Sequence, residues 1–332
     1  MKTTLKDIAS ETGYSISTVS RVLSGSNKIS GKTKNEVIRC AERLRYPFDK
    51  RQAIPNSKSE LNIALLTDFH EVEFYAAFFY GFSKVTVEEN VNLALYNVLY
   101  PDRQLDPMLS GLSHEFYDGI ILYAPEMTQK GYKELMHTIP PGYPIVSISV
   151  IENPVISTIS FDSYGGGYLA GEHFEKRNYN KLGIIKGPFN KAESRYRYNG
   201  YKDFIAQSSS CNLVWEIDGE FRFEDGIEAF KEYEKLDDKP NAVFACNDMM
   251  AKGFAEAAKY HGYRIPDDVA ILGYDDLPMC ENSYPSLSSV HTDFEQLGMA
   301  TIEVLKRKIY NHTTQTRMLS LVPVSISVRQ ST

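Results

Sequence analysis

The sequence predicts an all-α head at the N-terminus, followed by an α/β core built from two doubly wound parallel sheets. The first 47 residues contain short helical patterns with capping signals. From Leu61 onward, short apolar runs typical of strands alternate with longer runs of helical spacing, which indicates βαβ units. This second region extends to Thr332 and is longer than one hydrophobic core usually organises, which favours two lobes.

Two short helices joined by a tight turn are predicted at the start of the head. Thr4 and Asp7 have the spacing of a capping box, so the first helix is expected to begin at Leu5. Gly13 is expected to end this helix, because glycine enters the left-handed C-cap conformation without steric cost. Ser15 can cap a second helix. Its apolar face is formed by Ile16, Val19 and Leu23. The pair forms a helix-turn-helix, a motif whose second helix enters the DNA major groove.

The second helix begins with small side chains, and base edges are read at this end of such a helix. Arg21 is the best candidate for a bidentate contact to guanine, and Ile16 for a contact to a thymine methyl. A helical hairpin with an exposed arginine and no DNA role has the same local pattern. A third helix, capped by Ser30, adds lysines for phosphate contacts. The predicted DNA contacts of the head are Ile16, Ser17, Ser20, Arg21, Lys28, Lys32 and Lys34.

Charge is distributed unevenly along the chain, whose net charge is −7. Residues 1–60 contain 12 Lys and Arg against 6 Asp and Glu, whereas the remainder contains 24 against 37. A basic head on an acidic body is typical of a protein that brings only its head to phosphates.

The four cysteines lie far apart and include no C-x-x-C pair, so neither a zinc site nor a disulfide framework is expected. No apolar run reaches membrane-spanning length, and the N-terminus lacks the apolar core of a signal peptide. These observations favour the reducing cytoplasm and no membrane partner.

The core region contains seven candidate strands and five candidate helices. The strands are expected at 62–67, 92–98, 119–123, 144–150, 182–186, 241–245 and 269–273. The helices are expected at 74–89, 164–176, 195–207, 225–233 and 249–261.

The run TLKDIASETGYSISTVSRVLSGSNKISGKT at residues 4–33 closely resembles the N-terminus of LacI/GalR-family transcription regulators. The family pattern is T-x-x-D-V/I-A, then G-V-S, T-V-S-R-V-L/I-N and V/I-S-x-x-T, and Ser24 stands where asparagine is usual. The core resembles the family's effector-binding core, which has the fold of periplasmic sugar-binding proteins. That resemblance is carried by residues 161–171, Arg197, Gly200, Tyr201, 244–251, 265–270, 273–276, Val328 and Arg329.

The resemblance implies two similar lobes joined by three crossings, near residues 161, 291 and 322. It divides the chain into four parts: a head at 1–47, a linker at 48–60, an N-terminal lobe and a C-terminal lobe. The N-terminal lobe comprises 61–161 plus 291–322, and the C-terminal lobe comprises 162–290 plus 323–332. The effector is expected between the lobes.

Effector contacts are predicted where polar residues follow candidate strands, because ligands of open α/β sheets lie beyond the carboxyl ends of the strands. By resemblance, Arg197, Asn247 and Asp275 contact the effector, and Phe74, Tyr75 and Phe221 are aromatic walls. Asp162 is expected to contact either the ligand or only the hinge. Asp248 and Asp276 are instead expected to cap the helices that follow them.

The glycine run at 165–171 has the spacing G-x-G-x-x-x-G, so close packing of a helix is a better interpretation than a dinucleotide site. The sequence contains no G-x-S-x-G, no H-E-x-x-H and no histidine pair at ligand spacing. We therefore expect no catalytic residues, no metal and no cofactor.

The resemblance implies a repressor of a sugar-utilisation operon, controlled by a small effector, a sugar. Its head binds half of a near-palindromic operator in double-stranded DNA, so a homodimer is expected. One alternative is a solute-binding protein or a sugar-processing enzyme of similar fold, and another is a regulator whose core binds a phosphocarrier protein. In the linker, relatives insert a leucine between base pairs. Pro55 occupies that position here, and Ile54 is the candidate replacement.

Overall fold

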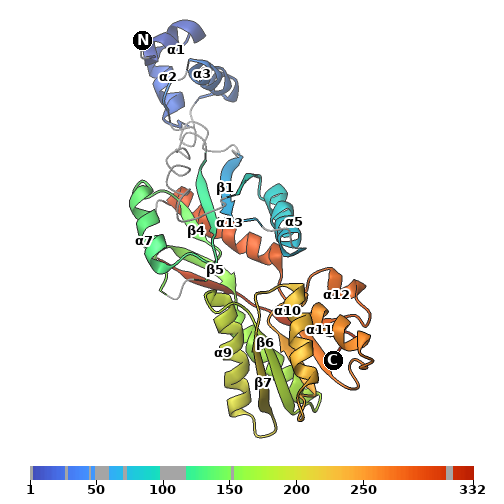
Figure 1. Ribbon diagram of the computed structural model, residues 1–332. Helices are drawn as coiled ribbons and strands as arrows, with labels where there is room; N and C mark the ends of the chain where they lie inside the picture. Colours follow the sequence, from blue (N-terminus) through green and yellow to red (C-terminus); the bar gives the residue numbers. More distant parts are fainter. Residues whose placement is uncertain are drawn as a thin grey trace. The chain divides into compact units, whose positions relative to one another are not determined.

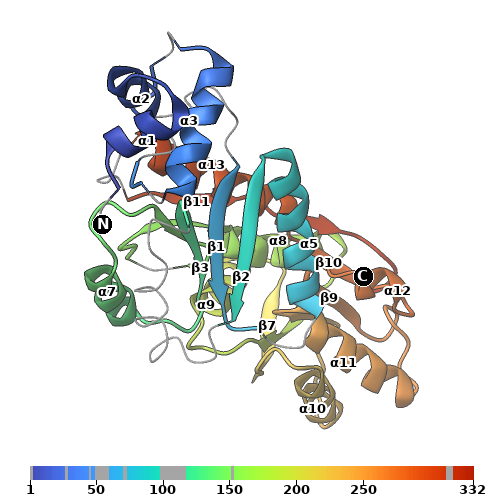
Figure 2. The ribbon, with the colours of Figure 1, turned by 90° about the horizontal axis from the view of Figure 1, so that it is seen from above.

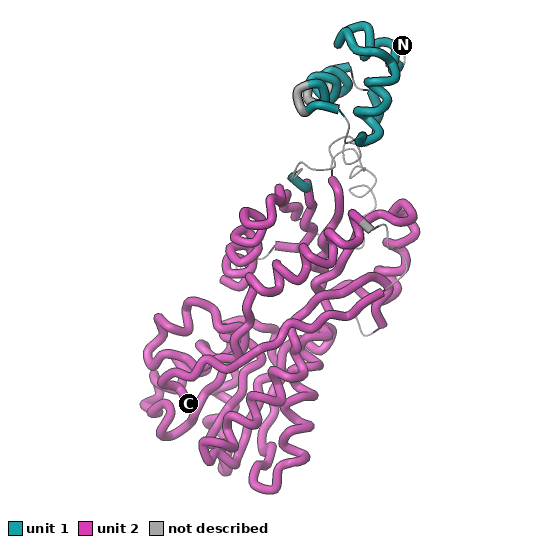
Figure 3. Tube along the Cα trace, turned by 180° about the vertical axis from the view of Figure 1, so that it is seen from behind, with its two compact units in different colours: residues 1–61 teal, residues 62–332 magenta. Residues whose placement is uncertain are grey.

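The structure is a computed structural model that describes residues 3–26, 29–44, 46–48, 60–69, 73–97, 117–150, 153–311 and 317–332. The chain forms two compact units, Met1–Leu61 and Asn62–Thr332 (Figure 3). Lys28, Ile54 and Pro55 lie outside the described residues, so the predictions made for them stay predictions.

The first unit contains the three predicted helices, α1 (Leu5–Thr12), α2 (Ile16–Leu23) and α3 (Gly31–Arg43). The backbone N–H of Thr4 donates to Asp7 Oδ2 at 2.7 Å, which fixes the start of α1. Gly13 has φ of 74° and its N–H donates to the carbonyl of Ala9, so it ends α1 as expected. The N–H of Thr18 donates to Ser15 Oγ at 3.1 Å and caps α2.

The apolar faces of these helices close one small core. The third helix contributes Val37 and Ala41, both fully buried, as the sequence predicts. An ion pair joins Arg43 Nη2 to Glu11 Oε1 at 2.7 Å, so the end of α3 is also tied to α1. The other buried members of this core are Ile8, Ala9, Val19, Val22, Leu23, Ile38 and Cys40.

The second unit contains two six-stranded sheets (Figure 1). The first has the order β11-β5-β4-β3-β1-β2, and the pairs from β11 to β1 are parallel. Its strands are β1 (Leu61–Thr67), β2 (Val91–Asn97), β3 (Gly119–Tyr123), β4 (Ile145–Ser147), β5 (Ser157–Phe161) and β11 (Leu319–Val322).

The second sheet has the order β12-β10-β9-β8-β6-β7, and only its edge strand β12 runs antiparallel to its neighbour. Its strands are β6 (Lys181–Lys186), β7 (Asn212–Asp218), β8 (Ala242–Ala245), β9 (Ala270–Asp275), β10 (Ser288–His291) and β12 (Ser325–Ser327).

Strand order shows that the chain passes between the sheets three times, after β5, after β10 and after β11. Two of these crossings are joined, because the N–H of Asp162 donates to the carbonyl of Val322 at 2.9 Å. At the remaining crossing, the hydroxyl of Thr292 donates to the carbonyl of Asp275 at 2.8 Å. The three connections are therefore hydrogen-bonded to the sheets that they join.

Helices cover both sheets. The first sheet carries α5 (Glu73–Glu88), α7 (Gln129–Thr138) and α13 (Phe294–Asn311), and α5 packs against β2 and α13 (Figure 2). The second carries α8 (Ser163–Lys176), α9 (Ala192–Gln207), α10 (Phe223–Glu234), α11 (Asp248–Tyr260) and the short α12 (Met279–Asn282).

Every strand and helix expected in the core is present, within a few residues of its predicted bounds. Five strands and three helices were not expected, namely β5, β7, β10, β11, β12, α7, α12 and α13. Several of these strands are edge strands or short, and β7 alternates exposed and half-buried positions. Such strands lack the continuous apolar run that identifies a buried parallel strand.

The glycine run packs α8 tightly against α9, as the sequence predicts. A Cβ added to Gly167 would lie 1.9 Å from the carbonyl oxygen of Arg197. From the other side, a Cβ added to Gly200 would lie 2.0 Å from the carbonyl oxygen of Tyr164. The two helix backbones are therefore in direct contact, and no side chain fits between them.

We predict that Gly167→Ala destabilises the protein by about 3 kcal/mol, because the helices must separate to admit the methyl group. Gly298→Ala is the matched control in α13, where the nearest atom would be 3.4 Å from the new Cβ. The control is expected to be neutral or to stabilise by about 0.5–1 kcal/mol through helix propensity. Urea unfolding of both variants measures this, and equal effects would contradict the packing argument.

His173 is a buried titratable group in α8. Its Nε2 lies 2.9 Å from Thr332 Oγ1, and the side chain of Arg177 donates to the Thr332 carbonyl at 3.1 Å. Burial, together with the nearby charges of Arg177 and Lys176, lowers the pKa of His173 to about 4. The folded protein therefore favours the neutral form of the His173 imidazole.

His173 should make the protein less stable in acid. The unfolded chain takes up this proton near pH 6.5 and the folded chain only near pH 4, so stability present above 6.5 is lost as the pH falls through this window. His173→Gln should flatten the free energy of unfolding between these pH values. The exposed His137→Gln is the control and should leave the slope in place. Denaturant unfolding at a series of pH values measures both.

Candidate functional site

The predicted base-reading residues lie together on α2. Ile16, Ser17, Ser20 and Arg21 are all exposed, and Ile16 is 45% exposed despite its apolar side chain. The opposite face of α2 is buried in the head core. An exposed isoleucine at the start of a helix, beside two serines and an arginine, forms a surface that can follow base edges in a major groove.

Hydrogen bonds hold the beginning of this surface in place. Ser15 Oγ lies 2.9 Å from Ser17 Oγ and 2.8 Å from Thr18 Oγ1, in addition to its bond from the Thr18 N–H. The Tyr14 hydroxyl donates to Glu36 Oε2 at 2.5 Å, which joins the turn to α3. Among the predicted phosphate contacts, Lys34 is half-buried in α3. The side chains of Lys28 and Lys32 lie outside what the structure describes.

In the second unit, Arg197 of α9 and Asp275 at the end of β9, two of the predicted effector contacts, lie next to each other. Nη2 of Arg197 lies 3.2 Å from Asp275 Oδ1, and Nη1 donates to the carbonyl of Cys246 at 2.5 Å. The guanidinium carbon lies 3.6 Å from the ring centroid of Tyr274 and 5.7 Å from that of Phe221. The predicted aromatic wall Phe221 is thus next to Arg197.

The ion pair is almost completely buried, since Arg197 is 8% exposed and Asp275 5% exposed. Burial raises the pKa of Asp275, and the guanidinium of Arg197 opposes that rise. Asp275 also has a positive φ of 107°, which is uncommon for a residue other than glycine. A polar pair buried in a strained backbone position is the pattern expected of a ligand site.

Tyr123, at the carboxyl end of β3 in the first sheet, lies close enough to this pair to interact with it electrostatically. Burial raises the pKa of the Tyr123 hydroxyl well above its ordinary value, and the charges of Glu193 and Asp275 add to the rise. The other two predicted aromatic walls, both in α5, pack beside it. The ring centroid of Phe74 lies 6.1 Å from that of Tyr123, and the centroid of Tyr75 lies 6.2 Å from it.

Three polar contacts join the elements of the two sheets around these residues. The N–H of Val150, beyond β4, donates to Glu193 Oε1 in the first turn of α9 at 3.1 Å. Lys191 Nζ lies 3.2 Å from Glu126 Oε1. The N–H of Met279 donates to Glu73 Oε1 at 3.1 Å. We use the term inter-lobe site for Tyr75, Tyr123, Glu126, Lys191, Glu193, Arg197, Phe221 and Asp275.

Asn247, and not Asp248, caps the helix that follows β8. Asn247 is the N-cap of α11, because its Oδ1 accepts from the Met250 N–H at 3.0 Å. Its amide nitrogen donates to the carbonyl of Phe221 at 2.9 Å, so it also holds the aromatic wall. Asp248 is fully buried and accepts from the Leu277 N–H and the Ser289 hydroxyl. The prediction that Asp248 caps the helix was wrong.

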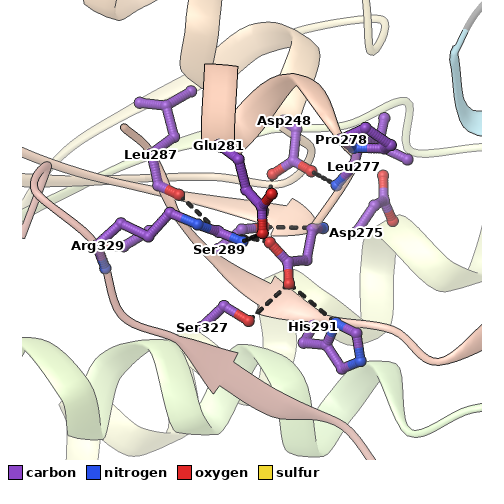
Figure 4. A network of polar contacts seen from close by, with 12 residues as sticks. Asp248, Asp275, Leu277, Pro278, Glu281, Leu287, Ser289, His291, Ser327 and Arg329 are labelled. Carbon is purple, nitrogen blue, oxygen red and sulfur yellow. Dashed lines mark hydrogen bonds and ion pairs between the residues drawn. The ribbon is translucent and has the colours of Figure 1, made fainter. Parts of the chain in front are cut away.

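The prediction that Asp276 caps a helix was also wrong, since the residue before α12 is Pro278. Asp276 accepts from Ser327 and from the Arg329 guanidinium at 2.6 Å, and its Oδ2 lies 2.9 Å from His291 Nδ1. Figure 4 shows this network and that of Asp248, with the Asp275 carboxylate pointing away from both. Neighbouring aspartates therefore face opposite ways.

Asp162 is the N-cap of α8, where its Oδ1 accepts from the Gly165 N–H at 2.8 Å. Together with the bond from its own N–H to Val322, this places Asp162 at the chain crossings. Of the two roles left open for it by the sequence, these contacts favour the hinge.

Glu193 and Tyr123 were not predicted. Tyr123 follows the rule that ligands lie beyond the carboxyl ends of strands, so the rule applied to β3 would have found it. Glu193 has no such signal, because its position depends on Val150 in another part of the chain.

Two further features complete the description. A groove of about 430 Å³ lies along α13, outside the inter-lobe site, and its lining residues are Glu89, Met299, Glu303, Lys306, Arg307 and Tyr310. In the ranges that the structure describes, no three His, Cys, Asp or Glu side chains are grouped to hold a metal ion, and no helix is long and apolar enough to cross a membrane.

A helix-turn-helix head and a two-sheet α/β core with a buried polar site define a class of protein: the ligand-controlled DNA-binding regulators. Comparison with known proteins agrees. Residues 4–47 match the family model of the bacterial regulatory proteins of the lacI family, and residues 171–332 match the periplasmic binding protein-like domain. The two matches together cover more than half of the chain. The chain belongs to the LacI family of transcriptional regulators and is not an enzyme.

Similar proteins span its whole length. The HTH-type transcriptional repressor PurR of Mannheimia succiniciproducens is 26% identical and covers 99% of this chain and 98% of its own. The ribose operon repressor of Haemophilus influenzae is 28% identical over 97% of both. Among solved structures, the CelR–cellobiose complex has a TM-score of 0.71 at 24% identity, covering 99% of this chain and all of its own. The Lac repressor dimer bound to operator and the anti-inducer ONPF has 0.73 at 21%, covering 100% and 99%.

We predict that Arg21→Ala weakens binding to the specific DNA site by about 1–3 kcal/mol and reduces discrimination at one base pair, because a bidentate base contact is lost. Lys34→Ala is the matched comparison. It should weaken binding to all sequences alike and reduce the slope of log affinity against log salt by about one. Gel-shift titrations with a site selected from a random DNA pool measure both. Equal losses on specific and random DNA for Arg21→Ala would contradict its assignment.

Proposed function

We propose that this regulator is a repressor of a sugar-utilisation operon, which binds a near-palindromic operator as a homodimer and is controlled by a sugar at the inter-lobe site. The observation that supports an effector there is the buried Arg197–Asp275 pair beside Phe221, with Tyr123 of the other sheet close enough to interact with the pair electrostatically. Residues from both sheets meet at this point, so a ligand bound here contacts both.

The four chain segments expected from the sequence become our domain assignment: a head at 1–47, a linker at 48–60 and two lobes. The lobes are 61–161 with 291–322, and 162–290 with 323–332. Rotation of one lobe against the other about the three crossings changes the positions from which two heads leave a dimer. Effector and operator are then coupled through two states of one core, which is allostery in the strict sense.

The chemistry of the inter-lobe site suits a polyhydroxylated molecule. A carboxylate accepts hydrogen bonds from two hydroxyls, and an aromatic ring covers the apolar face of a sugar ring. Asp275, Arg197 and Phe221 provide these groups, and Phe74 and Tyr75 extend the aromatic wall. Asn247 acts as a positioning residue for Phe221, and Asp162 for the crossings.

The names of similar proteins support a sugar as the effector. One relative is a ribose operon repressor, and one structural neighbour is a complex with cellobiose, whereas PurR carries no sugar in its name. A regulator of DNA acts where the chromosome lies, so we assign it to the cytoplasm. The alternative is that the core binds a phosphocarrier protein. Titration of the core with small sugars separates this alternative from a sugar effector.

We predict that Asp275→Ala removes the response to effector and leaves operator binding intact. Loss of a charged hydrogen-bonding group weakens effector binding by about 1.5–3 kcal/mol, or about ten- to a hundredfold. A thermal-shift screen of the full chain against sugars, nucleobases and sugar phosphates first identifies the effector, and calorimetry then compares wild type and variant.

Asp203→Ala is the control, because it removes a carboxylate of α9 that pairs with Tyr164 outside the inter-lobe site. Asp275→Asn, which keeps the shape of the side chain, tests the same idea if the alanine variant folds poorly. Unchanged effector affinity in a folded Asp275 variant would overturn the site assignment.

A further inference from the structure

The charges of the inter-lobe site do not balance. Two of its carboxylates are paired within the protein, Asp275 with Arg197 and Glu126 with Lys191. Glu193 is the third, and its Oε1 accepts the N–H of Val150. Among the described residues, no Lys, Arg or His forms an ion pair with Glu193. The site therefore contains one more negative charge than it contains positive charges.

Each of the two cations of the site already forms an ion pair with a carboxylate of the protein. Both terminal nitrogens of Arg197 donate within the protein, to Cys246 and Asp275, and its planar face lies against the Tyr274 ring. Its Nε is buried and has no hydrogen-bond partner among the described residues. A guanidinium has five N–H donors, so Arg197 keeps some of them, but its positive charge is already balanced by Asp275. Lys191 would have to leave Glu126 to bind a phosphate.

Glu193 lies close enough to the other site residues to act on them. Its charge affects both Tyr123 and Arg197. Burial raises the pKa of Glu193, whereas backbone hydrogen bonds and the charges of Arg197 and Lys191 oppose that rise. Poor solvation strengthens every interaction between charges, repulsion included. An anion beside Glu193 and Asp275 would be repelled by both carboxylates.

We propose that the inter-lobe site selects an uncharged or cationic polyhydroxylated effector and rejects phosphate esters, with Glu193 as a specificity-determining residue. This inference rests on the proposed function and narrows it to effectors that carry no phosphate. Among the described residues, Asp275 pairs with Arg197 through Oδ1, and Glu193 accepts the Val150 N–H through Oε1. The second oxygen of each is an acceptor for a hydroxyl or ammonium donor of the effector.

The test compares matched pairs of ligands on the full-length protein. The probes are glucose with glucose 6-phosphate, ribose with ribose 5-phosphate, fructose with fructose 6-phosphate, and glucosamine as a cation. Calorimetry at one pH and salt concentration measures each affinity. For whichever sugar binds, its phosphate ester should bind about a hundredfold more weakly or not at all, because like charges meet in a poorly solvated site.

Glu193→Gln removes the unpaired charge and keeps the size and the hydrogen-bond acceptor for Val150. In this variant the ratio of sugar affinity to phosphate-ester affinity should fall by about tenfold or more. Asp203→Asn is the matched control, with the same change of charge on the same helix but outside the site, and should leave the ratio unchanged. A shift of equal size in both variants would mean that net charge, not Glu193, sets the ratio, and would overturn the assignment.

Three results separate this inference from the proposed function. A phosphate ester that binds at least as tightly as its sugar and alters operator binding would overturn the inference and leave the function standing. A wild-type ratio that Glu193→Gln does not change would overturn the role of Glu193. Failure of every probe to bind at 10 mM, roughly the limit at which a weak site is detected, would count against the sugar effector itself and against this inference with it.

Discussion

The burial of one guanidinium group organises the second unit. A charged group taken out of water must be compensated by partners with good geometry. Arg197 obtains them from two neighbouring strands: the carbonyl of Cys246 directly after β8, and the ring of Tyr274 and the carboxylate of Asp275 in β9. Helix α9 is thereby held against the carboxyl edge of the second sheet.

Packing behind the site fixes the same residue. Gly167 of α8 lies against the carbonyl of Arg197, so the backbone that carries the guanidinium cannot move without separating two helices. Helix α8 itself begins at Asp162, next to two of the three chain crossings. A physical path of direct contacts therefore leads from the site to the connections between the lobes. Contacts of this kind let a small shift at a ligand become a rotation of a lobe, because packed helices have few stable arrangements.

Two other aspartates, Asp248 and Asp276, stabilise the scaffold around Asp275. Asp248 joins α11 to β10 through Ser289, and Asp276 joins the loop after β9 to β10 and β12 through His291, Ser327 and Arg329. These networks stabilise the edge of the sheet that the crossings leave and enter. Asp275 belongs to neither network, and its carboxylate pairs with Arg197 instead. Because Asp248 and Asp276 make the scaffold contacts, Asp275 is not needed for them and can bind a ligand.

Local interactions were determined by the sequence alone. The caps of Thr4, Gly13 and Ser15 involve residues at most four positions apart, so spacing was sufficient to predict the head and its exposed reading surface. The continuous apolar strands and the close glycine contact of α8 could also be predicted from the sequence, because each follows from a short pattern. The tertiary structure decided what depends on distant residues. In the folded chain, Asn247 caps α11, and Asp248 instead accepts a hydrogen bond from Ser289. Glu193 accepts a hydrogen bond from the distant Val150. The edge strand β7 escaped prediction because its pairing with β6, and not a continuous apolar run, makes it a strand.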